Sequence, residues 1–277
     1  MRVLRKIALR AVFGLVVLCR STLPALAAGE TESAFTKLVP AEQVENQARV
    51  QYYQLLNDAK AHRALAGFAH PLFIKVNTIS KRLIPFAIMR NARARNWQWE
   101  INVIGSNTLN AFCMPGGKIA VYSGLIQQLK LTDDELAMVI GHEMTHAIME
   151  HAREQMGKGA VTQGAARIGG MVAAGVLGVD PRMMDMVARG GSELLLLKFS
   201  RQDETQADLI GMEIAARAGF DPRSAISLWE KMARLETNTP NAWLSTHPAN
   251  KTRIRDLENN LNQVMPLYLN SQKTKAY

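Results

Sequence analysis

The stretch Val139-Ile140-Gly141-His142-Glu143-Met144-Thr145-His146-Ala147-Ile148 places two histidines four residues apart, with a glutamate directly after the first. On an α-helix, residues four apart lie above one another on one face, so His142 and His146 present two imidazoles side by side. This spacing suits one zinc ion, and Glu143 is placed to act as general base for a water molecule at the metal. The pattern therefore predicts a catalytic site with a single Zn²⁺ per chain, in preference to two ordinary core histidines.

The residues before this motif predict where its helix begins. Thr132-Asp133-Asp134-Glu135 has the form of a capping box, and an apolar run starts at Leu136. A threonine followed three residues later by a glutamate satisfies free backbone N–H groups at a helix N-terminus. We therefore expect a helix that begins here and carries His142 and His146 near its middle.

The composition is that of a folded protein with ample material for one core. The chain has 277 residues, of which 48% are hydrophobic and 21% are charged, and its net charge is +9. Five of those positive charges lie within residues 1–27, which contain no acidic residue. The remainder is only mildly basic, so the charge gives no reason to expect nucleic-acid binding.

Residues 1–27 have the three parts of a secretory signal peptide. A basic segment precedes the apolar run Ala11–Cys19, and Ala25-Leu26-Ala27 matches a cleavage site. The run is too short to span a bilayer. We therefore expect a periplasmic protein, exported through a cleaved signal, whose metallopeptidase domain comprises residues 28–277 with a core at about 40–264. Only Cys113 would remain after cleavage, which excludes an intramolecular disulfide, and peripheral contact with the inner or outer membrane stays open.

A small antiparallel sheet is predicted beside the motif helix. Alternating or apolar stretches at 97–103, 110–114 and 118–122 read as short strands, and Pro115-Gly116-Gly117 reads as a turn. In a peptidase, an edge strand can hydrogen-bond an extended substrate backbone. A purely structural hairpin explains the pattern equally well. The candidate substrate-binding residues of this edge strand are Asn110, Ala111, Phe112, Pro115 and Gly116.

A catalytic zinc ion needs a third protein ligand. Positions 149 and 152 hold Met149 and Ala152, which excludes a third histidine at the metzincin spacing. A later predicted helix at about 201–218 carries Glu204 and Asp208 four apart on one face, with Glu204 as candidate ligand. Asp208, one turn on, could accept the second N–H of a ligand histidine. A solvated acidic helix face is the rival interpretation.

The loop at residues 238–248 supplies the remaining candidates. His247 lies in this loop, and Arg253 follows at the start of a last polar helix. Either could donate a hydrogen bond to the oxyanion that develops during attack on a carbonyl. His247 could instead cap the open position of the metal and hold an enzyme inactive, and a helix-capping turn without a catalytic part is an equal alternative.

Several of these motifs together resemble the HtpX and CAAX-prenyl-endopeptidase family of zinc metallopeptidases, of gluzincin type. The resemblance covers about residues 40–260, and its periplasmic members of the BepA and LoiP kind are the most similar in architecture. It is carried by four segments in order: Asn110-Ala111-Phe112 with Pro115-Gly116-Gly117, Gly141–His146, Phe199–Asp208, and Ser245-Thr246-His247-Pro248 with Arg253.

The resemblance implies His142, His146 and Glu204 as zinc ligands, Glu143 as general base and Asp208 as a proton donor. It also implies a mainly helical α+β, zincin-like domain that acts on polypeptides. The expected function is a metalloendopeptidase for unfolded or misassembled envelope proteins. The alternative is a periplasmic chaperone or scaffold with structural zinc and latent or no proteolytic activity. We expect two departures from the family: no transmembrane helices of the kind that the integral-membrane members have, and no C-terminal helical repeat domain.

Overall fold

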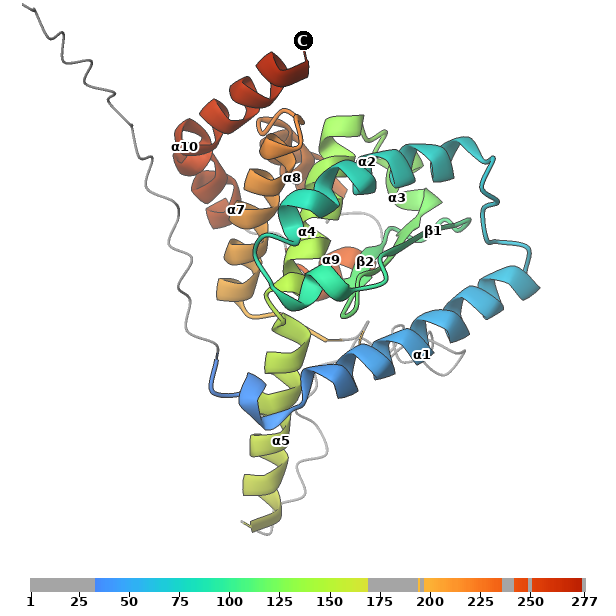
Figure 1. Ribbon diagram of the computed structural model, residues 1–277, viewed down its shortest axis with the longest axis vertical. Coiled ribbons are helices and arrows are strands. Elements are labelled where there is room, and N and C mark those ends of the chain that lie inside the picture. The colour runs from blue at the N-terminus through green and yellow to red at the C-terminus, as the bar shows by residue number, and fades with distance from the viewer. Residues whose placement is uncertain (1–32, 169–193, 195–196, 236–241, 249–250, 276–277) are drawn as a thin grey trace, which may run out of the picture. The chain divides into compact units, whose positions relative to one another are not determined.

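The computed structural model describes residues 33–168, 194, 197–235, 242–248 and 251–275 (Figure 1). All of them belong to the compact unit Glu32–Tyr277. The expected signal peptide, and most of the segment between α5 and α7, lie outside the described residues. The elements are η1 Thr36–Leu38, α1 Ala41–Ala61, α2 Pro71–Ala87, η2 Arg93–Asn96, β1 Glu100–Ile104, β2 Ala111–Met114, β3 Lys118–Tyr122, α3 Ser123–Gln128, α4 Asp133–Ile148, α5 His151–Ile168, α7 Arg201–Arg217, α8 Ser224–Leu235, α9 Ala242–Thr246 and α10 Lys251–Lys275.

The mainly helical α+β class is confirmed, and the small sheet has three strands in the order β1-β3-β2. The expectation that all its strands are antiparallel is wrong: β2 is antiparallel to β3, but β1 runs parallel to it. An alternating pattern shows which residues form strands and carries no sign of the direction of their neighbours. The turn was predicted correctly, since Gly116 and Gly117 have φ of 84° and 76°, a region that favours glycine.

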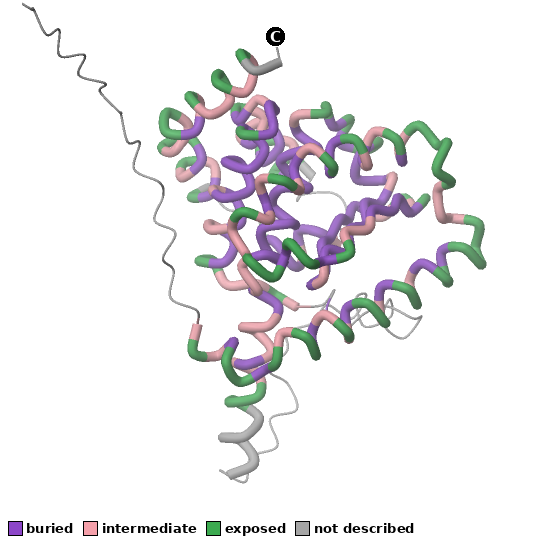
Figure 2. Tube along the Cα trace, in the orientation of Figure 1, coloured by how far each residue is buried: buried purple, intermediate pink, exposed green. Residues whose placement is uncertain are grey.

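The two faces of the sheet pack against different helices. Phe112, Ala120 and Tyr122 pack with α1 residues in one apolar cluster. Alternate residues such as Ala111 and Val121 belong to the larger cluster, which includes α2 and α4. Figure 2 shows the buried residues concentrated in the sheet and α4. The sheet is therefore a middle layer that holds β2 against the motif helix.

Helix α4 is the centre of the fold. Every residue from Glu135 to Ile148 is buried, which a helix surrounded by other elements requires. It meets α7 through two glycines: a Cβ on Gly141 would lie 2.7 Å from Gly211 O, and one on Gly211 would lie 2.7 Å from His142 N. The two backbones thus touch where the motif begins.

No helix among the described residues combines the length and the hydropathy that crossing a membrane requires. Cys113 is a free, buried thiol. It lies on β2, which contacts α4.

Candidate metal centre

The two motif histidines converge as predicted. The Thr132–Glu135 capping box forms and starts α4 at Asp133. His142 Nε2 and His146 Nε2 lie 3.1 Å apart, and both residues are 3% exposed. Two buried imidazoles with their Nε2 atoms this close share a point that a metal ion could occupy.

Glu204 reaches the same point from the first turn of α7. A second capping box, between Ser200 and Asp203, fixes the start of this helix, and it was not predicted from the sequence. Glu204 Oε2 lies 3.6 Å from His142 Nε2, and Oε1 lies 3.5 Å from His146 Nε2. Because α4 and α7 touch at Gly141 and Gly211, the third candidate ligand arrives from 58 residues along the chain.

His247 completes the group. Its Nδ1 lies 3.2 Å from His142 Nε2 and 2.9 Å from Glu204 Oε1. One ligand atom from each of His142, His146, Glu204 and His247 lies within 4.8 Å of the others. Three imidazoles and one carboxylate form a nitrogen and oxygen donor set that suits zinc.

Glu204 also shows an unsatisfied oxygen that fits a metal ligand. No described residue donates a hydrogen bond to the buried Oε2, although Arg253 Nη1 lies 2.7 Å away as an ion-pair partner. That nitrogen is near enough for attraction but lacks hydrogen-bond geometry. A buried carboxylate oxygen without a donor is costly, and a bound cation would satisfy it. The residues present therefore fit one zinc ion.

Asp208 orients the first histidine from behind. Its Oδ1 lies 3.0 Å from His142 Nδ1, and Arg253 donates from Nε and Nη2 to the same carboxylate at 2.6 and 2.7 Å. Trp229 Nε1 is 3.3 Å from Oδ1. Burial alone would raise the pKa of Asp208, but Arg253 and these hydrogen bonds outweigh it and lower the pKa to about 2. The carboxylate is therefore charged and holds the Nδ1–H of His142, which leaves Nε2 directed at the centre.

The charges at the centre are mutually adjusted. Burial raises the pKa of Glu204, but His247, His142 and Arg253 reverse this and lower it. Burial, followed by the neighbouring His142 and His247, lowers the pKa of His146. Burial would also lower the pKa of His247, but Glu204 and Glu143 raise it overall. An anionic Glu204 beside a neutral His146 is the protonation state that binds a divalent cation.

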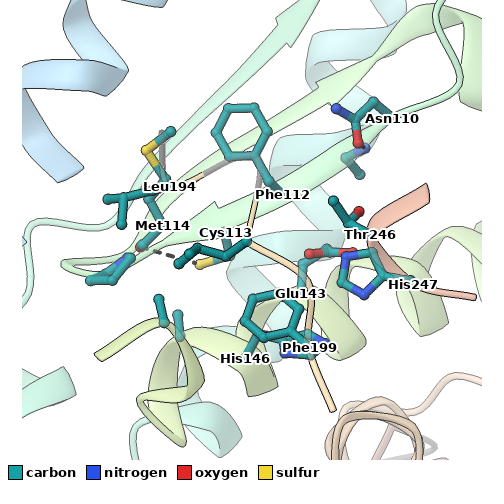
Figure 3. A pocket seen from close by; sticks show the side chains of 15 residues that line it. Asn110, Phe112, Cys113, Met114, Glu143, His146, Leu194, Phe199, Thr246 and His247 are labelled. Atoms are coloured by element: carbon teal, nitrogen blue, oxygen red, sulfur yellow. Dashed lines mark hydrogen bonds and ion pairs between the residues drawn. The ribbon is translucent and has the colours of Figure 1, made fainter. Parts of the chain in front are cut away.

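Glu143 lies at the wall of a pocket under the sheet. Trp243 Nε1 donates to its Oε1 at 2.5 Å, and His247 Nε2 is 3.6 Å from the same oxygen. Figure 3 shows Glu143, His146 and His247 together on one side of this pocket and strand β2 on the other. Four of the five edge-strand candidates line it, namely Asn110, Ala111, Phe112 and Pro115, and Gly116 does not.

Four residues at the centre were not predicted from the sequence: His151, Phe199, Gln206 and Trp243. The ring of Phe199 stacks on His146 at 4.0 Å and 28°, and His151 Nδ1 lies 2.9 Å from His146 Nδ1. His151 is not at helical spacing from the motif, and Trp243 has no pattern that marks it. Arg253, expected as a possible donor in the pocket, does not line it and lies behind Asp208 and Glu204.

Two histidines on one helix, a glutamate between them and an acid from a second helix define the zinc metallopeptidase class. The chain belongs to peptidase family M48, whose family model matches residues 75–261. Family membership is thus confirmed, whereas a place near HtpX or the CAAX-prenyl endopeptidases stays a prediction.

Relatives with similar sequences are named as metalloendopeptidases, metalloproteases or proteases. The chain is 37% identical to the mitochondrial metalloendopeptidase OMA1 of Schizosaccharomyces pombe over 191 residues. The matched region covers 68% of this chain and 53% of that protein. It is 29% identical over 182 residues to the metalloprotease LoiP of Escherichia coli, covering 66% and 70% respectively. It is 26% identical over 205 residues to the β-barrel assembly-enhancing protease of Escherichia coli, covering 72% and 40%. The chain spans between 30% and 59% of the length of the OMA1 proteins of fission yeast, Arabidopsis thaliana, budding yeast and Bos taurus.

Proposed function

We propose that this chain is a zinc-dependent endopeptidase that hydrolyses peptide bonds of exported, unfolded or misassembled cell-envelope proteins. The observation that carries the proposal is the convergence of His142, His146 and Glu204 on one point, next to a pocket that Glu143 and His146 line. The envelope assignment is supported by the signal-like residues 1–27. The names of LoiP and the β-barrel assembly-enhancing protease agree with a bacterial protease role.

The proposed chemistry divides between the metal and Glu143. When bound by His142, His146 and Glu204, zinc supplies a Lewis acid that polarises the scissile carbonyl and acidifies water. Glu143 accepts the proton of the attacking water and passes it to the nitrogen of the leaving amine. Trp243 occupies Oε1 of Glu143 with a hydrogen bond, so Oε2 is the oxygen left for the proton.

Asp208 has an orienting role in this scheme, not that of the proton donor implied by family resemblance. Its carboxylate already accepts hydrogen bonds from Arg253, His142 and Trp229, and its lowered pKa of about 2 leaves it no proton to give at neutral pH. Arg253 supports Asp208 and is not assigned to the oxyanion.

The substrate is proposed to bind as an additional strand along β2. Among the described residues, β2 pairs only with β3, on one of its two edges. β2 lines the pocket opposite Glu143 (Figure 3). An extended polypeptide added to a free strand edge gains backbone hydrogen bonds that do not depend on sequence, which suits unfolded substrates.

His247 is proposed to gate the centre. With Nδ1 beside His142 and Glu204 it provides a fourth ligand, whereas a catalytic zinc site keeps one position open. The same observation favours the second candidate function, a scaffold or chaperone with structural zinc, because structural sites have four protein ligands. The two functions differ in the role of Glu143, which is required for cleavage in a peptidase and has no catalytic role in a scaffold.

The test is the Glu143→Gln variant of the full chain, assayed with zinc and an unfolded casein substrate. We expect zinc content equal to wild type and cleavage reduced by at least about a thousandfold, because the amide that replaces the carboxylate cannot accept a proton. Glu154→Gln, which changes an acid outside the centre on α5, is the matched control and should cleave as wild type. Undiminished cleavage by Glu143→Gln refutes the mechanism, and a zinc-loaded wild type that never cleaves favours the scaffold.

A further inference from the structure

The junction between α4 and α5 places a histidine where a continuous helix could not. α4 ends at Ile148 and α5 begins at His151. In an unbroken helix at 100° per residue, the fifth residue after His146 would lie about 140° around the axis and face away from it. Instead Glu150 adopts a φ of 59°, and His151 returns against His146, with the ring centroids 4.9 Å apart.

The left-handed turn at Glu150 is unusual for a residue with a side chain, because Cβ then crowds the backbone. It is held in place by local bonds: Glu150 N donates to Ala147 O at 3.1 Å, and Arg153 Nη1 lies 2.6 Å from Glu150 Oε2. Strained backbone of this kind persists where the surroundings require one geometry. Here the geometry it produces is the contact between His151 and His146.

The partners of His151 determine where its proton lies. His151 is 2% exposed, and its Nε2 is 2.6 Å from Gln206 Oε1. An amide oxygen can only accept, so His151 Nε2 carries the hydrogen and, in the neutral ring, Nδ1 is bare. His151 Nδ1 lies 2.9 Å from His146 Nδ1, so His146 is the donor of that bond. His146 Nε2, which faces Glu204 and His142, then keeps its lone pair for a metal.

We propose that His151 and Gln206 are positioning residues that fix the tautomer and ring orientation of His146 toward the metal. They do for the second ligand histidine what Asp208 does for the first, but with a neutral chain of hydrogen bonds instead of a carboxylate. The inference rests on the proposed zinc binding. It adds a functional residue from α5 and one from α7, two residues beyond the candidate ligand Glu204.

The competing interpretation is that His151 only fills space between α5 and α7. Three variants separate the two. His151→Phe keeps a flat ring and removes the acceptor. His151→Asn is smaller, but its amide oxygen can occupy the place of Nδ1 and accept from His146. Gln206→Leu leaves His151 in place and removes the acceptor that sets its tautomer. His62→Phe, at an exposed histidine of the α1 C-terminus, is the control.

The measurement is zinc affinity of the full chain, by competition with a chromophoric chelator, together with the thermal midpoint of each metal-free protein. We expect His151→Phe to bind zinc about 10- to 100-fold more weakly than wild type. His151→Asn should stay within severalfold of wild type, Gln206→Leu should lie between the two, and His62→Phe should not change. The positioning role predicts that affinity follows the presence of the acceptor and not the volume of the side chain.

Wild-type affinity in His151→Phe overturns the inference, and so does a loss in His151→Asn as large as in His151→Phe. If His151→Phe does not fold, Gln206→Leu decides, because it leaves the packing of His151 intact; unchanged affinity there also overturns the inference. These failures are distinguishable from failure of the proposed function, in which the wild type itself binds no zinc or, once loaded, cleaves nothing.

Discussion

The metal centre is assembled from two regions that are built differently. In the first, α4 and α7 carry His142, His146 and Glu204, and their backbones touch at Gly141 and Gly211. The second region, α9, has five residues and precedes His247. It is attached through a hydrogen bond from Trp243 N to Leu109 O at 3.0 Å and through aromatic stacking. The three proposed ligands are thus carried by two helices whose backbones touch, whereas His247 follows a short helix that is held by the packing of its side chains, such as Trp243, in the core.

The strongest way to break the α4–α7 contact is Gly211→Ala. The added Cβ would lie 2.7 Å from His142 N, and a backbone atom cannot turn aside as a side chain can. We expect the free energy of unfolding to fall by about 3 kcal/mol and zinc affinity to fall with it, measured by urea unfolding and chelator competition. Gly159→Ala on α5 is the matched control, because its Cβ meets nothing within 4 Å. It should be neutral or stabilising, by up to about 1 kcal/mol. Equal effects of the two variants would contradict the contact argument.

Asp208 on α7, which accepts a hydrogen bond from His142 on α4, makes the free energy of unfolding depend on pH in the acid range. The pKa of Asp208 is lowered from 3.8 to about 2 in the folded protein. Its stabilising contribution is therefore present above about pH 4 and is lost as the pH falls through about 2. We expect the metal-free wild type to lose about 2 kcal/mol more unfolding free energy over this interval than Asp208→Asn does. Parallel pH profiles for the two proteins would show that Asp208 is not paired as described.

In the second region, His247→Ala should open the proposed zinc site and increase the rate of cleavage. The variant loses the proposed fourth ligand and the 2.9 Å contact with Glu204, which as a charge-assisted bond is worth about 1 to 2 kcal/mol. We expect casein cleavage to rise by about five- to thirtyfold while zinc remains bound by the other three ligands. A fall in the rate of cleavage would instead assign His247 to the oxyanion.

The smallest effect is expected for Trp243→Phe, which keeps an aromatic ring against Trp229 and removes the donor to Glu143. One hydrogen bond of about 1 kcal/mol corresponds to about a fivefold lower kcat, with KM and zinc content unchanged. Steady-state kinetics separates these quantities. A change in KM alone would place Trp243 in substrate binding.

Much of the centre was predictable because several of its residues lie only a few positions apart in the sequence. His142 and His146 meet in any helix because they are four residues apart, and the Thr132–Glu135 capping box predicts that helix. Glu204 could be proposed by excluding nearer ligands, but its meeting with the histidines depends on Gly141 facing Gly211, a contact between distant segments that no local pattern reveals. His151 was missed because its position depends on a left-handed Glu150. The parallel pairing of β1 with β3 was missed because strand direction leaves no mark on alternation.

The stacked indoles of Trp229 and Trp243, with ring centroids 5.2 Å apart at 27°, have a consequence for observing the protein. The Trp229 ring on α8 donates to Asp208 and the Trp243 ring on α9 donates to Glu143, so the pair joins two helices that each contact a carboxylate of the centre. Two indoles at this separation couple their electronic transitions, and the coupling depends steeply on mutual angle. Circular dichroism in the near ultraviolet is thus a native, label-free gauge of the angle between these two rings, and so of the packing of α9 against α8.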